Sequence, residues 1–220
     1  TAKRGVPRNA SPLLVGDAIY MAADDGRVTC LDAKTGADRW DRLVGKAYSA
    51  SPVYAGGFVY LLDEDGMARV TDAFVHAARR AVRLGFEVIE LHSAHGYLLH
   101  QFLSPLSNLR DDGYGGPLAN RMRFPLEVLE AVSAVVPPTT VLGMRISATD
   151  WVEGGWSVDD SIEYLRTAQG LGIDYVCVSS AGLTAHAQVP VGPGYQVPAA
   201  ARIRAATGLV TRAVALITSA

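Results

Sequence analysis

Two histidines and a tyrosine lie close together directly after a short apolar segment of the chain. Residues 91–97 read LHSAHGY, so that His92 and His95 are three positions apart and Tyr97 follows two positions later. Two imidazoles at the end of one strand can direct their N–H groups at a single oxygen atom, polarise a carbonyl and stabilise the charge that develops on it. A nearby phenol can donate a proton. The pattern predicts a site that binds and activates a carbonyl compound.

The same three residues admit other interpretations. A metal ion could bind His92 and His95 with His100 as a third ligand, since open catalytic zinc sites take three protein ligands. No cysteine lies nearby and no closely spaced carboxylate completes such a set, so we predict a site without a metal. Histidines that only hydrogen-bond within a loop, and a tyrosine that only packs its ring, are the structural alternatives.

Arg145 is the next unusual residue, because it lies inside the apolar run VLGMRIS. A cation in such a position must pair with an acid or bind an anion. The structural interpretation gives it a partner such as Glu90, and the functional interpretation gives it the anionic edge of a cofactor. Cys177 also lies in an apolar segment, where a thiol packs more often than it reacts.

The elements that must position these side chains alternate between strand and helix. From apolar spacing we predict helices at 74–84, 123–135, 158–171 and 197–206, and strands at 88–92, 140–146, 175–179 and 210–216. Such alternation is typical of βαβ units with a parallel sheet. The histidine segment and Arg145 then lie at carboxyl ends of strands, where ligands bind in parallel α/β folds.

The segment 1–70 follows a different pattern, because an internal repeat runs through it. Ser11-Pro12 recurs as Ser51-Pro52, and Asp25-Gly26 recurs as Asp65-Gly66 in the same register. An apolar run before each Asp-Gly turn predicts a β-meander. The period of the repeat, which is the offset between Ser11 and Ser51, is typical of propeller blades. The segment SPLLVGDAIYMAADDGRVTCLDAKTGADRW resembles the PQQ-type propeller repeat, which we assign to about residues 8–66.

Composition excludes several other classes of function. The 220 residues are 49% hydrophobic and 19% charged, with a formal net charge of −2, so the chain is globular and lacks the basic field that nucleic-acid binding requires. No apolar run approaches the roughly 18 residues of a membrane span, and the segment 1–7 lacks the apolar core of a signal peptide. We therefore predict a cytoplasmic protein that acts on a small molecule, without nucleic acid or membrane as partner.

Three ordered blocks of the second region identify a family. FEVIELHSAHGYLLHQFLSPLSNLRDDGYGGPLANRMRF, MRISATDW and VPVGPGYQVPAAARIR resemble the old yellow enzyme family, the NADH:flavin oxidoreductases, over about residues 74–218. The resemblance implies a TIM barrel that binds FMN, is reduced by NADH or NADPH, and passes hydride to an α,β-unsaturated carbonyl, an enone-type substrate. It implies that His92 and His95 bind the substrate oxygen and that Tyr97 protonates the α-carbon. It implies that Arg145 faces the pyrimidine side of the flavin. It places Ala215 near the FMN phosphate, where the family has glycine and a Cβ could obstruct close approach of the backbone.

The predicted fold class is therefore α/β: a partial (β/α)8 TIM barrel of about four central-to-late βα units at 71–220, preceded by an all-β propeller-like region at 1–70. A complete barrel takes about 250 residues and a propeller about four to eight blades, so neither closes. Propeller-like hairpins, or a second copy in a homo-oligomer, would have to cover the open face. An inactive incomplete barrel, a non-catalytic scaffold repeat protein and a chimeric fragment are the alternatives.

Overall fold

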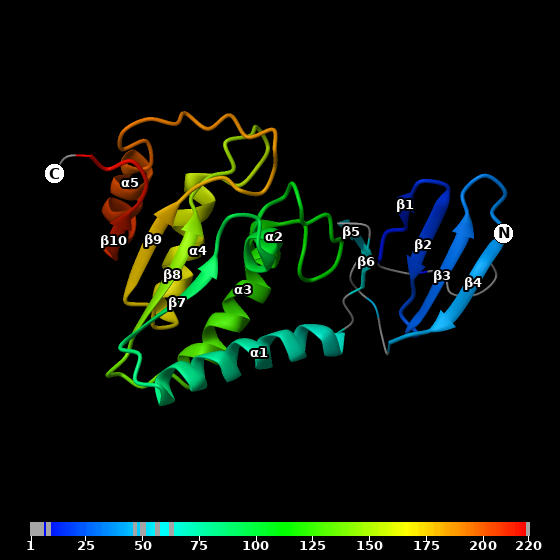
Figure 1. Cartoon of the computed structure of the whole chain (residues 1–220), viewed down its shortest axis with the longest axis horizontal. Helices are drawn as coiled ribbons and strands as arrows, with labels where there is room; N and C mark the ends of the chain where they lie inside the picture. The colour runs from blue at the N-terminus through cyan, green and yellow to red at the C-terminus, as the bar shows by residue number, and fades with distance from the viewer. Residues whose placement is uncertain are drawn as a thin grey trace. The chain divides into compact units, whose positions relative to one another are not determined.

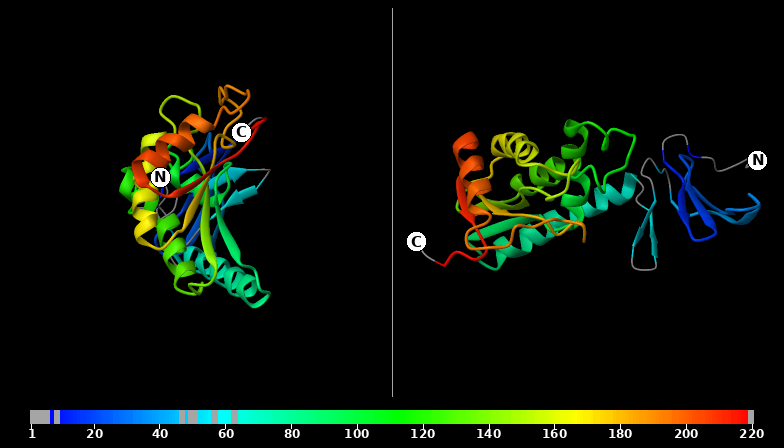
Figure 2. Two further views of the ribbon diagram at one scale, coloured as in Figure 1. Left: turned by 90° about the vertical axis from the view of Figure 1, so that its left-hand side faces the viewer. Right: turned by 90° about the horizontal axis from the view of Figure 1, so that it is seen from above.

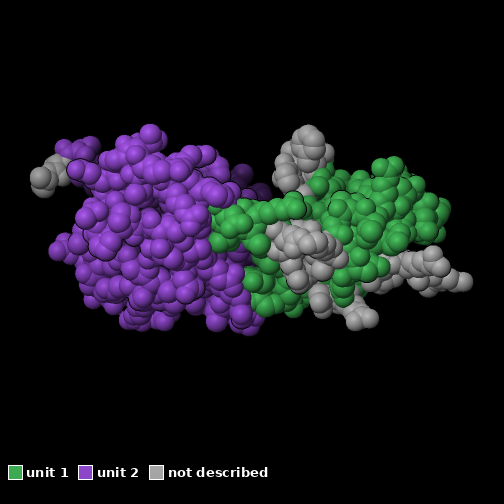
Figure 3. All heavy atoms as spheres, turned by 90° about the horizontal axis from the view of Figure 1, so that it is seen from below, with its two compact units in different colours: residues 1–72, 109–116 green, residues 73–108, 117–220 purple. Residues whose placement is uncertain are grey.

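The computed structural model describes residues 7, 10–45, 48, 52–55, 58–61 and 64–218. The chain divides into two compact units (Figure 3). The first unit comprises Thr1–Asp72 with Leu109–Gly116, and the second comprises Ala73–Asn108 with Pro117–Ala220. Within the described residues, no helix is long and apolar enough to cross a membrane.

The first unit contains a four-stranded antiparallel sheet whose strands are neighbours in sequence order (Figure 1). The strands are β1 (Leu13–Val15), β2 (Ala18–Ala22), β3 (Arg27–Asp32) and β4 (Asp38–Leu43). Gly16 turns the chain between β1 and β2 at a φ of 60°, and Gly36 does so between β3 and β4 at 69°, a conformation that glycine adopts without steric cost. The meander predicted for the first copy of the repeat is confirmed.

The second copy of the repeat forms only a hairpin. Strands β5 (Val53–Ala55) and β6 (Phe58–Tyr60) pair antiparallel, at the positions that correspond in the repeat to β1 and the start of β2. The predicted Asp-Gly turn at 65–66 is wrong, because both residues lie within helix α1 (Glu64–Arg83). This helix begins ten residues before the predicted position, because apolar residues continue at helical spacing toward its start: Met67, Val70, Phe74, Val75 and Ala78.

The second unit is built on a four-stranded parallel sheet with the order β10-β9-β8-β7. Its strands are β7 (Val88–Ser93), β8 (Val141–Ser147), β9 (Tyr175–Ser179) and β10 (Val210–Ala213). All four lie where the sequence predicts them, except that β10 ends three residues early. It ends there because Ala215 and Leu216 have positive φ angles of 68° and 51°, which a strand cannot accommodate.

Helices cover one face of this sheet, as Figure 2 shows for α3, α4 and α5. The helices that follow α1 are α2 (Leu98–Leu103), α3 (Leu118–Ser133), α4 (Val158–Gly170) and α5 (Val197–Thr207). Helix α4 begins at a capping box, in which the Ser157 hydroxyl accepts the Asp160 N–H and the Asp160 carboxylate accepts the Ser157 N–H. The short helix α2 was not predicted, and α3 begins five residues before its predicted start.

The two faces of the sheet differ in character. Leu91, Met144 and Val176 are neighbours in register and belong to the apolar core that packs against α1, α3, α4 and α5. The adjacent positions on each strand point to the opposite face and carry His92, Arg145 and Cys177. The helix-free face therefore presents the side chains that the sequence singles out.

Candidate active site

The carboxyl ends of β7, β8 and β9 carry one strained residue each. His95, Trp151 and Ala181 lie in the loops that follow these strands, with φ angles of 57°, 56° and 58°. A residue with a side chain adopts this left-handed conformation only where its surroundings enforce it, at a cost of about 1–3 kcal/mol, and such residues gather at functional sites. This edge of the sheet is the candidate active site.

Arg145 lies at the centre of the polar row on the helix-free face. Its register neighbours are His92 on β7 and Cys177 on β9. The Arg145 Nε is buried and has no hydrogen-bond partner in the part of the chain that the structure describes. Cys177 is fully buried with a free thiol, as predicted for a packing residue.

Glu90 is not the partner of Arg145. Its Oε2 accepts hydrogen bonds from the Tyr175 hydroxyl at 2.8 Å and from Arg212 Nη2 at 2.9 Å. Glu90 is paired in register with Gly143, and the Tyr175 ring occupies the space that a side chain at Gly143 would fill. The structural interpretation of Arg145 as the ion-pair partner of Glu90 is therefore wrong, and the Arg145 Nε has no hydrogen-bond partner among the described residues.

The structure brings the two predicted histidines and the tyrosine together. The ring centroids of His92 and His95 are 5.4 Å apart, and those of His92 and Tyr97 are 5.1 Å apart. Tyr97 lies at the start of α2 and is 63% exposed, so that its hydroxyl can exchange protons with solvent. The three side chains form one cluster at the carboxyl end of β7.

Burial and charge act on the two histidines in the same direction. Burial lowers the pKa of His92, and the nearby Arg145 cation lowers it further. The pKa of His95 is lowered for the same two reasons in the same order. Each imidazole is therefore held neutral at a pH where a free histidine would begin to ionise, and a neutral imidazole offers one N–H donor.

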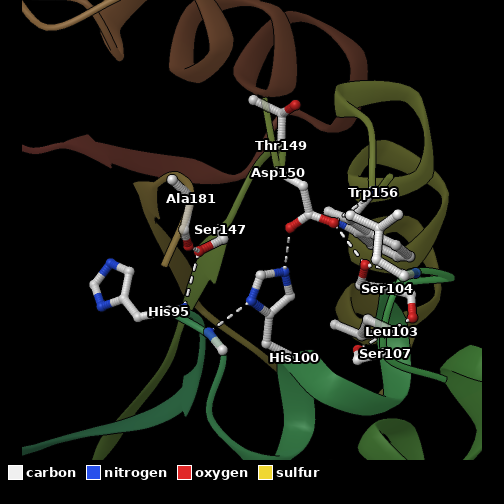
Figure 4. Close-up of polar contacts among 12 residues, drawn as sticks. His95, His100, Leu103, Ser104, Ser107, Ser147, Thr149, Asp150, Trp156 and Ala181 are labelled. Atoms are coloured by element: carbon white, nitrogen blue, oxygen red, sulfur yellow. Dashed lines mark hydrogen bonds and ion pairs between the residues drawn. The ribbon is translucent and has the colours of Figure 1, made fainter. Parts of the chain in front are cut away.

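Two serines that sequence reasoning did not single out hold His95 in place. Ser147 Oγ accepts the His95 backbone N–H at 2.9 Å and donates to the Ala181 carbonyl at 2.7 Å (Figure 4). The His95 Nε2 lies 2.7 Å from Ser179 Oγ. One hydroxyl thus ties together the loops that follow β7, β8 and β9. The only signal in the sequence is their position, because Ser147 directly follows the predicted strand 140–146 and Ser179 ends the predicted strand 175–179.

His100 does not stand with the other two histidines as a ligand. Its side chain is fully buried, its Nδ1 accepts the Gly96 N–H at 2.9 Å, and its Nε2 lies 3.1 Å from Asp150 Oδ1. The hydrogen bond at Nδ1 and the carboxylate in contact with Nε2 occupy both ring nitrogens, which contradicts the metal interpretation in which His100 is the third ligand. Among the residues that the structure describes, no group of three His, Cys, Asp or Glu side chains is arranged to hold a metal ion.

Ala215 lies in the loop after β10, where the sequence resemblance expects contact with the cofactor. It is exposed, and its φ of 68° is in the region that favours glycine. Gly194, which lies shortly before α5, donates its N–H to the Leu216 carbonyl at 3.0 Å. This hydrogen bond joins the loop after β10 to the start of α5. Ala215 thus adopts a backbone conformation that glycine favours, at the position where the family pattern has glycine.

A cavity of about 660 Å³ lies beside this edge of the sheet, between the loops after β8 and β9 and helix α5. Trp151, Tyr195 and Arg202 are among its lining residues. It shares no residue with the cluster of His92, His95, Tyr97 and Arg145, so the polar cluster and the cavity are separate features.

Residues 41–213 match the NADH:flavin oxidoreductase / NADH oxidase family. The NADPH dehydrogenase of Listeria innocua is 46% identical over 145 residues, which are 66% of this chain and 42% of that protein. The NADPH dehydrogenase of Geobacillus thermodenitrificans is 48% identical over 151 residues, which are 69% of this chain and 44% of that protein. The chain belongs to this family, and it spans less than half the length of these curated relatives.

Solved structures agree with this assignment. Histamine dehydrogenase from Rhizobium sp. 4-9 has 31% sequence identity and a TM-score of 0.61, over 72% of this chain and 23% of that one. Morphinone reductase, at 22% identity and a TM-score of 0.56, covers 94% of this chain and 48% of its own, and shows the fold alone. The predicted family, an oxidoreductase family that works with FMN and NADH or NADPH, is confirmed. None of these comparisons supports a propeller repeat.

Proposed function

We propose that this chain carries the substrate-activating part of an FMN-dependent NAD(P)H oxidoreductase of the ene-reductase type. The observation that carries the proposal is the Arg145 guanidinium. Its Nε is buried on the same row as His92 and has no partner among the described residues. A guanidinium in this position fits the anionic edge of a flavin, because charge pairing there stabilises the reduced, negatively charged form. Ala215 would contact the cofactor through its exposed backbone.

The residues of the cluster have distinct roles in this proposal. Bound FMN would supply a hydride, taken from NADH or NADPH, to the β-carbon of an enone-type substrate. His92 and His95, kept neutral by burial and by Arg145, would donate hydrogen bonds to the substrate carbonyl oxygen and stabilise its developing negative charge. Tyr97 would give a proton to the α-carbon and regain one from water. The carbon–carbon double bond thereby gains one hydrogen on each carbon, and NAD(P)H and one proton are consumed.

Titration of the purified chain with FMN tests this proposal. We expect the flavin fluorescence to be quenched on binding, and Arg145→Gln to weaken the affinity by at least about tenfold, the factor that loss of one charge-assisted hydrogen bond of about 1.5–3 kcal/mol gives. Arg166→Gln is the matched control, because Arg166 is half exposed on α4 and pairs with Glu163 at the surface. No quenching with wild type, or equal affinity for the two variants, would refute the assignment of Arg145.

A second proposal concerns the segment that carries the internal repeat. We propose that residues 1–70 and 71–220 act as separate domains, and that the first is a PQQ-type repeat with a binding or scaffold role. The meander β1–β4 and the hairpin β5–β6, which recurs in the register of the repeat, support it. In that case the variants His92→Ala and Arg145→Ala would leave the affinity of the chain for its partner unchanged.

A homo-oligomer that covers the open sheet face, a chimeric origin and a cytoplasmic location stay predictions.

A further inference from the structure

A buried histidine–aspartate pair lies behind the loop that carries His95 and Tyr97. His100 on α2 and Asp150 in the loop after β8 are both fully buried, with Nε2 3.1 Å from Oδ1 (Figure 4). The proposed chemistry uses neither His100 nor Asp150. Burying two ionisable groups lowers the stability of the folded chain unless each finds polar partners, so their contacts need an explanation.

The hydrogen bonds around the pair fix the position of its proton. The Gly96 backbone N–H can only donate, so the His100 Nδ1 that receives it at 2.9 Å carries no proton. The proton of the neutral ring must then be on Nε2, where it faces Asp150. His100 thus presents an acceptor to the loop and its protonated Nε2 to the carboxylate 3.1 Å away, whereas in the other tautomer Nδ1 could not accept the Gly96 N–H.

Asp150 is itself fixed from two further directions. Its Oδ2 accepts the Ser104 hydroxyl at 2.6 Å and the Trp156 N–H at 2.8 Å. Burial raises the pKa of this carboxyl, but the hydrogen bonds from His100, Ser104 and Trp156 outweigh burial and hold the pKa below its usual value. Asp150 is therefore a charged and immobile acceptor that orients the His100 ring, as a buried carboxylate orients a catalytic imidazole in other enzymes.

The loop that receives this support is strained and tightly enclosed. His95 and Gly96 have φ angles of 57° and 74°. A Cβ on Gly96 would lie 2.5 Å from the Gly182 carbonyl oxygen, so the backbone has no room to move toward the loop after β9. Consecutive N–H groups of this segment are held by buried side chains, that of His95 by Ser147 and that of Gly96 by His100.

We propose that His100 and Asp150 are positioning residues, which hold the Gly96 peptide so that His95 and Tyr97 on either side of it face the substrate. The structural part of this inference concerns the loop alone, and only its consequence for catalysis rests on the proposed function. Because His100 acts through a backbone N–H, its effect should be seen first at Gly96.

Amide hydrogen exchange on the full chain, followed by NMR, tests the structural part. His100→Gln keeps a donor near the position of Nε2 but offers no acceptor at the position of Nδ1, whereas the amide oxygen of His100→Asn can replace Nδ1. We expect Gly96 exchange to be faster in His100→Gln by about 2- to 12-fold, the range that loss of one hydrogen bond gives, and to return toward the wild-type rate in His100→Asn.

The amide of Ala181 is the internal control, because it donates to the Thr149 carbonyl at 2.8 Å and does not contact His100. A faster rate at Gly96 with an unchanged rate at Ala181 supports the proposal. Equal acceleration at both amides, which a merely structural loss of stability would cause, overturns it, and so does an unchanged Gly96 rate in His100→Gln.

A second measurement separates this proposal from the proposed function. If the chain binds FMN and reduces an enone, His100→Gln should lower kcat while leaving the Kd for FMN unchanged, since Arg145 is not disturbed. If the chain binds no FMN, the proposed function fails, and the exchange rate at Gly96 still decides whether His100 holds the loop. An FMN affinity that falls as much as kcat would show that His100 supports the whole sheet edge rather than this loop.

Discussion

Removal of the Ser147 hydroxyl should disturb the candidate site more than any other single-atom change. Ser147 is 1% exposed, and its Oγ accepts the His95 N–H at 2.9 Å and donates to the Ala181 carbonyl at 2.7 Å. In Ser147→Ala both backbone groups lose this partner. A buried polar group left without its hydrogen bond costs about 1–3 kcal/mol, and His95 is only half-buried, so we expect the free energy of unfolding to fall by about 2–4 kcal/mol.

Thr207→Val provides the matched control for Ser147→Ala. The Thr207 hydroxyl also joins a backbone carbonyl to a backbone N–H, that of Ile203 at 2.8 Å and that of Leu209 at 3.3 Å, but at the end of α5. Urea unfolding measures the loss of stability in each variant, and NMR of ¹³C/¹⁵N-labelled histidine measures the environment of the His95 ring. We expect Ser147→Ala to shift the His95 ring signals and Thr207→Val to leave them unchanged.

Two outcomes would contradict this reasoning about Ser147. Unchanged His95 signals in Ser147→Ala would mean that Ser179, 2.7 Å from His95 Nε2, is sufficient to hold the ring. A loss of stability no larger than that of Thr207→Val would mean that the two freed backbone groups find water. Either result would show that the Ser147 hydroxyl does not determine the position of His95.

Two further predictions concern the sheet and the histidines. Gly143→Ala should lower stability by about 1–3 kcal/mol in urea unfolding, because its methyl group would overlap the Tyr175 ring, whereas Gly170→Ala has open space and should be neutral or stabilising; similar values for both would contradict the close approach. Because the pKa values of His92 and His95 are lowered by folding, the unfolded chain binds more protons, and stability should fall as the pH drops below the ordinary histidine pKa of about 6.5 and be retained above it. Replacing both histidines with glutamine should flatten this part of the pH profile, and an unchanged profile would contradict the assignment.

The pairing of Arg145 illustrates what a sequence cannot decide. Glu90 and Arg145 alternate onto the same face of neighbouring strands, so an ion pair between them was a reasonable interpretation. Register places Glu90 opposite Gly143 instead, and the missing side chain there lets Tyr175 reach across β8 to Glu90. A glycine in a strand carries no local signal that a ring from the neighbouring strand will cover it.

The boundary between the two patterns was also misjudged, for a related reason. The internal repeat predicted a turn at 65–66, but residues on either side of position 70 carry apolar side chains at helical spacing, and helix α1 includes the predicted turn. The similarity to the first copy of the repeat predicted a turn, whereas the spacing of apolar residues predicted a helix. The helix forms because its 20 residues can bury a continuous apolar face. The hairpin of β5 and β6, which precedes α1, forms at the positions that the repeat predicts, because its two strands pair with each other.

The sequence by itself determined the alternation of strands and helices in the second unit, the family, and the set of His92, His95, Tyr97 and Arg145 at strand ends. These follow from apolar periodicity and from motifs that are local in the chain. Only the tertiary structure decided that Arg145 lacks an acidic partner among the described residues, that Ser147 and Ser179 hold His95, and that His100 faces Asp150 rather than a ligand. These contacts join residues from different strands and loops, and their existence depends on the register of the sheet, which no local pattern encodes.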